Sequence, residues 1–208
     1  MLLLMGSMGI SAQKIHHLNV ELNVARYAPI PRSYFLRFAP IPPKFTWVNG
    51  FNIGYSTSER TSYFIGFRKV NYSVNNIGDL SHLNLIADGI EVRFGTRFSI
   101  NSAQRVYLSF GIEVSDEITA QKGTLESDHP GITRINKLAS YLSLAPSIQL
   151  NLRILNNVLL FVDTRFQLGF ESSTPVDNIR TGIKPIFNET YYTTQFDPIN
   201  CLGVRFEL

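Results

Sequence analysis

The stretch "NVLLFVDTRFQLGF", residues 157–170, decides the fold because its odd and even positions differ in chemistry. Successive side chains of a β-strand point to opposite faces of a sheet, so the stretch divides into two sets. One set is apolar and consists of Leu160, Val162, Thr164, Phe166, Leu168 and Phe170. The other set consists of Phe161, Asp163, Arg165, Gln167 and Gly169. This alternation predicts a β-strand with one apolar face and one polar face, and we call the positions of the polar face the wet parity.

The same alternation recurs along the chain. The apolar positions of seven further stretches fall at 18–24, 45–55, 63–67, 90–98, 106–114, 142–152 and 202–208. With the opening stretch, they predict eight strands. Runs of roughly ten to fifteen residues are long for a soluble sandwich, but they suit strands that cross a membrane at a tilt.

Composition narrows the class of protein. The chain has 208 residues, which fits one domain. Charged residues make up only 17% and hydrophobic residues 44%, so the protein has either an apolar surface or a large core. The net charge of +3 is spread evenly, which excludes a nucleic-acid groove. No run of 18 apolar residues occurs, so a membrane crossing requires a barrel.

Ligand motifs for a metal or cofactor are lacking in the sequence. A single cysteine, Cys201, excludes a disulfide framework and a zinc site built from paired cysteines. His16 and His17 are adjacent, but no second cluster of ligands lies at a suitable spacing. We therefore expect no cofactor and no metal.

The N-terminal residues 1–13, "MLLLMGSMGISAQ", resemble a secretory signal peptide. A short apolar run is followed by the small residues Ser11 and Ala12. No Lys or Arg precedes the run, which suggests that the true start lies further upstream. A short buried strand or helix is the alternative. The expected division is a signal at 1–13 and a barrel at 14–208.

The lengths of the connections separate a membrane barrel from a soluble one. Short joints are expected near 57–61, 100–104 and 154–157, and long ones near 28–44, 73–85, 115–136 and 172–194. Short and long joints alternate strictly. An outer-membrane barrel has short periplasmic turns and long extracellular loops, whereas a lipocalin-like barrel needs no such asymmetry. The sequence thus predicts an all-β, eight-stranded, antiparallel up-and-down transmembrane β-barrel in the bacterial outer membrane.

The chain resembles the eight-stranded outer-membrane β-barrel family of Bacteroidota that includes the PorT-like proteins. The resemblance rests on the "SAQ" ending of the signal, the strands "GIEVRFGTRFSI" and "RVYLSFGIEVS", and the terminal strand "CLGVRFEL". It covers essentially the whole mature chain. It implies a surface-binding or scaffold protein, or a component of an envelope secretion apparatus. Phe206 and Leu208 share the outward parity, so we expect the last strand to engage the barrel assembly machinery.

The wet parity should fill the interior, because a barrel of about eight strands has room only for side chains. The expected interior network is Glu21, Arg68, Glu91, Arg93, Arg97, Glu113, Arg153, Asp163, Arg165, Glu171, Arg205 and Glu207. Six acids face six arginines, and a planar guanidinium can satisfy a carboxylate with two bonds. Two hypotheses remain open: a packed polar plug, and a charged gate or proton path.

Other functions are considered on specific residues. Asp79, Ser81 and His82 raise the alternative of a lipid-modifying enzyme, although no lipase signature surrounds them. A narrow channel is a further alternative. The proline-interrupted segment 28–44 carries "PRSYFLRF", which either contacts lipopolysaccharide or a protein partner outside the cell or folds over the barrel mouth. The expected partners are outer-membrane lipid, the assembly machinery and a protein at the extracellular loops.

Overall fold

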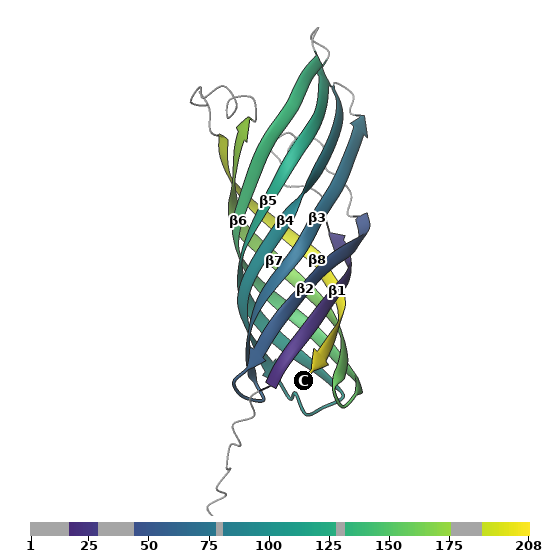
Figure 1. Ribbon diagram of the computed structural model, residues 1–208, viewed down its shortest axis with the longest axis vertical. Helices are drawn as coiled ribbons and strands as arrows, with labels where there is room; N and C mark the ends of the chain where they lie inside the picture. The colour runs from purple at the N-terminus through teal and green to yellow at the C-terminus, as the bar shows by residue number, and fades with distance from the viewer. Residues whose placement is uncertain (1–16, 29–43, 78–80, 128–131, 176–188) are drawn as a thin grey trace, which may run out of the picture.

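Eight antiparallel strands form a closed barrel in the computed structural model, which describes residues 17–28, 44–77, 81–127, 132–175 and 189–208. The strands are β1 (His17–Ala28), β2 (Lys44–Ser56), β3 (Thr61–Ile77), β4 (Ser81–Ile100), β5 (Val106–Ser127), β6 (Ile132–Leu155), β7 (Val158–Pro175) and β8 (Glu189–Glu207). Each strand pairs with its neighbours in sequence (Figure 1). β8 closes the ring on β1, from Asn19↔Glu207 to Tyr27↔Ile199. The predicted fold class is confirmed.

The two faces of each strand have the chemistry that the alternation predicts. On β7, Phe166 and Leu168 are 42% and 44% exposed on the outside, whereas Arg165 and Gln167 are completely buried inside. The outward positions of β5 are apolar from Val106 to Val114. Exposed apolar side chains occur on all eight strands, and we call the ring that the outward ones form the belt. A closed barrel with an apolar outside and a charged inside is the arrangement of transmembrane barrels.

Short turns connect the strands at one end of the barrel. They occupy residues 57–60, 101–105 and 156–157. The Thr57 N–H donates to the Thr61 carbonyl at 3.0 Å. In the second turn, Asn101 has a φ of 54°, a left-handed conformation that asparagine tolerates better than most residues, and its carbonyl accepts from the Gln104 N–H at 2.9 Å. These turns lie where the sequence predicts short joints.

Two segments predicted as long loops are mostly paired strands, so that prediction is wrong for 73–85 and 115–136. β3 and β4 pair as far as Ile77↔His82, and β5 and β6 as far as Glu126↔Ile132. Strands β3 to β6 therefore reach well beyond the ends of β1 and β2 (Figure 1). We call residues 70–77, 81–87, 117–127 and 132–139 the extension. Residues 1–16, 29–43, 78–80, 128–131 and 176–188 lie outside the described residues, and with them the predicted signal and most of the proline-interrupted segment.

Candidate functional site

The interior of the barrel collects charged side chains from strands around the ring. Among the described residues, seven acids and six cations are buried: Glu21, Glu91, Glu113, Glu117, Asp163, Glu171 and Asp197, with Arg68, Arg93, Arg97, Lys137, Arg165 and Arg205. Arg26 adds a further cation, because it pairs with Asp197 at 2.8 Å while 14% of its side chain is exposed. The charges of the two signs are therefore nearly balanced. Burial of so many charges is tolerable only when they are paired and hydrogen-bonded.

Glu21 is the centre of the network near the short turns. This fully buried carboxylate accepts from Arg97 Nη1 on β4 at 2.5 Å and from Arg205 Nε on β8 at 2.7 Å. It also accepts from Asn52 Nδ2 on β2 at 2.5 Å. Arg205 Nη2 donates in addition to Gln149 Oε1 on β6 at 2.5 Å. The Glu21 cluster thus ties β1, β2, β4, β6 and β8 together across the lumen.

Arg165 is the centre of a second cluster. Its Nη1 donates to Glu113 and lies 3.0 Å from Glu91 Oε1, and its Nη2 lies 3.6 Å from Asp197 Oδ2. Arg68 on β3 forms a second ion pair with Glu91. The planar guanidinium of Arg165 therefore joins carboxylates from β4, β5 and β8, as its several donors allow.

Arg93 connects the two clusters, and Asn200 joins Asp163 to the second cluster. Arg93 Nη2 donates to Asn52 Oδ1 at 2.7 Å, and Arg93 Nη1 lies 3.9 Å from Glu113 Oε2. Asn200 donates to Asp163 Oδ2 at 2.7 Å and accepts from Arg68 Nη1 at 3.2 Å. The charges form one continuous network that fills the lumen, and not a row of separate surface pairs.

A glycine and an aromatic ring shape the network beside β4. Arg97 stacks over the ring of Phe64, with its guanidinium carbon 4.1 Å from the ring centroid. A Cβ atom on Gly95 would lie 2.6 Å from Phe64 Cε1, which is closer than atoms pack. Gly95 therefore leaves the space that the Phe64–Arg97 stack occupies.

An irregularity in β8 adds residues that the sequence analysis missed. Asp163 pairs with Cys201, whereas Arg165, two residues on, pairs with Asp197, so β8 has two extra residues here. As a result Asp197, Asn200 and Cys201 are all buried. The Cys201 thiol contacts Asn23 Oδ1 at 2.9 Å. Pro198, which has no N–H to donate to a ladder, is the sequence signal for this bulge.

The structure places ten of the twelve predicted network residues in the buried interior. Arg153 and Glu207 differ, because they pair with each other at 3.5 Å near the short turns with 29% and 30% of their side chains exposed. Asn52, Gln149 and Asn200 belong to the network but were not predicted. Asn52 and Gln149 lie on the wet parity, where neutral amides are ordinary, and Asn200 lies inside because of the bulge in β8, so alternation alone does not single them out.

The chemistry available in the interior is ion pairing and hydrogen bonding. Among the described residues, no group of three or more His, Cys, Asp or Glu could hold a metal ion. None of the described residues forms a helix long and apolar enough to cross a membrane. Asp79 lies outside the described residues, and of Ser81 and His82 only the backbone, in β4, is described.

Comparison with known proteins identifies a fold for this chain but does not identify a family. The sequence matches no family model. It also matches no curated protein. A solved structure of a major outer membrane protein from Thermus thermophilus is similar with a TM-score of 0.52 at 7% identity, over 93% of this chain and 100% of that chain.

Two further solved structures are less similar. CarO2 of Acinetobacter baumannii gives a TM-score of 0.41 at 9% identity, over 92% of this chain and 98% of that chain. Ail, the attachment invasion locus protein of Yersinia pestis, gives a TM-score of 0.36 at 15% identity, over 93% of this chain and 97% of that chain. The fold similarity to the Thermus protein agrees with the closed ring of eight antiparallel strands. The chain has the fold of a small outer-membrane β-barrel protein.

Proposed function

We propose that the protein is a non-conducting barrel of the bacterial outer membrane that presents its extension outside the cell as a binding surface for a protein partner. The belt meets lipid, the short turns face the periplasm, and β8 engages the assembly machinery during insertion. The apolar outside of the barrel supports this placement, because exposed Leu, Ile and Phe side chains are stable in lipid.

The filled lumen is the observation that carries the proposal. Arg165, Glu91 and Glu21 are completely buried, and they come from β7, β4 and β1. Their ion pairs cross the centre of the barrel, where a channel would need water. A barrel of this size has no room for both a packed network and an aqueous path. The interior therefore serves as a structural plug rather than as a channel or a gate.

The outer face of the extension supplies the binding surface. Ile86, Ile118 and Leu138 are 57%, 40% and 43% exposed there. Each lies one outward position beyond the polar residues Asp88, Asp116 and Ser140 on β4, β5 and β6. Exposed apolar side chains that lie beyond the polar boundary of the belt are available for contact with a protein partner.

A more specific form of the proposal is a role in an envelope secretion apparatus, as the resemblance to PorT-like proteins implies. A plugged barrel with an extended outer surface suits an anchoring component better than a conduit. Deletion of the gene should then leave secreted proteins inside the envelope. Normal secretion in the deletion strain would leave surface binding as the role. No described residue favours the alternatives of a lipid-modifying enzyme or a narrow channel over these two.

Site-specific photo-crosslinking in living cells tests the proposal. A photoreactive residue at Ile118 or Leu138 should give a discrete crosslink to one protein, because both side chains point outward from the extension. The matched control is Leu108, which is 42% exposed on the same strand as Ile118 but lies within the belt. Protein crosslinks from Leu108 and none from the extension would contradict the proposal.

A further inference from the structure

The wall of the barrel has a break between β2 and β3. Their pairing ends at Gly50↔Arg68, whereas β3 remains paired with β4 as far as Ile77↔His82. Beyond Gly50, the described pairing of β2 is with β1 alone. A Cβ on Gly50 would lie 2.7 Å from the Phe67 carbonyl oxygen, so the two strands are still tightly packed where the break begins. Unpaired strand edges in a membrane protein need another partner.

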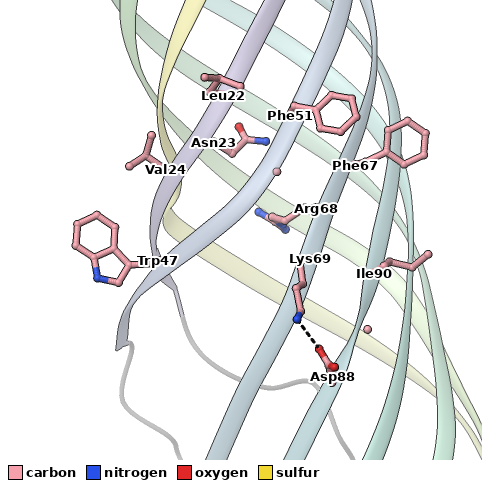
Figure 2. Close-up of a pocket in the computed structure, with 12 residues that line it drawn as sticks. Leu22, Asn23, Val24, Trp47, Phe51, Phe67, Arg68, Lys69, Asp88 and Ile90 are labelled. Carbon is pink, nitrogen blue, oxygen red and sulfur yellow. Dashed lines mark ion pairs between the residues drawn. The ribbon is translucent and has the colours of Figure 1, made fainter.

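A groove of about 1060 Å³ lies at this break. Its apolar wall is formed by outward side chains of the belt, namely Leu22, Val24, Trp47, Phe51, Phe67 and Ile90. Figure 2 shows Trp47 and Phe67 at opposite sides of the groove, with Arg68 between the ribbons of β2 and β3. Phe51 and Phe67 are in ring contact, with their centroids 5.6 Å apart. The volume is close to the upper limit of the range of small-molecule sites.

The polar lining of the groove consists mostly of hydrogen-bond donors. Asn23 and Arg68 are 4% and 3% exposed, and Asn23 Nδ2 and Arg68 Nε have no hydrogen-bond partner among the described residues. The other Arg68 nitrogens contact Glu91 and Asn200. At the rim, Lys69 Nζ is 3.8 Å from Asp88 Oδ1, and both side chains are more than half exposed. Buried donors without a partner are costly, so they point to an acceptor that comes from outside the chain.

We infer that the groove binds a single-chain fatty acid taken from the surrounding membrane. The acyl chain packs against Trp47, Phe51 and Phe67, and the carboxylate accepts from Asn23 and Arg68 close to Lys69. Lys69 and Asp88 are the first charged outward residues beyond the belt on β3 and β4, so the groove lies at the level where lipid headgroups meet the acyl chains. A lipid enters it sideways without passing through the plugged lumen. The inference rests on the proposed membrane placement.

Trp47 is the only tryptophan of the chain and is 79% exposed, so its fluorescence reports on this groove alone. The full chain is refolded into phosphatidylcholine vesicles and titrated with dibromostearate, whose bromine atoms quench tryptophan. We expect saturable quenching by the acid and weaker, unsaturable quenching by its uncharged methyl ester. Lys69→Gln should raise the half-saturating concentration of the acid about fivefold, and the matched Lys122→Gln on the outer face of β5 should not change it.

A relocated reporter separates this inference from membrane insertion. In the double variant Trp47→Phe and Phe166→Trp, the tryptophan lies in the belt on β7, away from the groove. Its quenching should rise in proportion to the total brominated lipid, which shows insertion without a site. The same linear response at Trp47 would overturn the inference while leaving the membrane placement intact. Equal quenching of Trp47 by a dibrominated anionic phospholipid would overturn the choice of a single-chain fatty acid.

Discussion

Arg165 is the residue on which the interior network depends most. It contacts Glu91, Glu113 and Asp197, which come from three different strands, and it is completely buried. A buried charge that loses its partner costs far more than the same charge at the surface, since water cannot replace the lost bond. The contribution of each ion pair to stability should therefore follow its burial.

The variant Arg165→Ala tests this dependence on burial. It leaves three carboxylates without their shared cation, so we expect the free energy of unfolding to fall by about 3–5 kcal/mol. Urea unfolding of the refolded protein in lipid vesicles measures the change. The matched control is Arg153→Ala, which removes a pair with Glu207 that is about 30% exposed and should cost less than about 1 kcal/mol. Equal losses for the two variants would contradict the account of the interior.

At the scale of the strands, the belt and the extension should respond differently to a charge on the outer face. Phe166→Arg places a guanidinium near mid-depth of the belt and should cost about 2–4 kcal/mol of stability in a bilayer. Leu138→Arg places the same group on the extension, at an equally exposed position, and should be close to neutral. Unfolding titrations in vesicles compare the two. A neutral Phe166→Arg would show that the outward parity does not meet lipid.

Alternation predicts strands only where the two faces meet different surroundings. Along β7, lipid lies outside and packed charges lie inside, so the parities of residues 160–170 differ sharply. In the extension both faces carry polar residues, as with Gln121 inside and Lys122 outside on β5, and the signal is lost. Because the alternation is lost there, the sequence predicts loops at 73–85 and 115–136. The bulge between Asp197 and Cys201 was missed for a different reason. Its two extra residues keep the same parity on either side, but they place the adjacent residues Asn200 and Cys201 both inside, which alternation does not predict.

The interior site was predictable in its members but not in its contacts. The wet parity identifies Glu21, Arg97 and Arg205 as inward residues, yet nothing in their spacing shows that both arginines bind the same carboxylate. The partners are set by the strand register across the lumen. The proposed role of Asn23 and Arg68 as ligands follows only from the break between β2 and β3. The sequence does not show where the pairing of these two strands ends.

For the whole molecule, the proposed orientation predicts which end reaches the outside of the cell. A cysteine at Lys122, on the outer face of the extension, should react with a membrane-impermeant maleimide on intact cells. A cysteine at Glu59, in the exposed turn between β2 and β3, should react only after the envelope is opened. The native Cys201 is 1% exposed and gives little background. Labelling of Glu59→Cys on intact cells would reverse the orientation.

The central claim is that paired charges fill the barrel and close it to ions. Conductance of the purified protein in planar lipid bilayers tests this claim most directly. We predict no stable conductance, because the ion pairs of Glu21, Arg165 and their partners occupy the lumen from wall to wall. A steady, ion-selective conductance whose selectivity changes in Asp163→Asn or Arg165→Gln would contradict the account and establish a channel through the network.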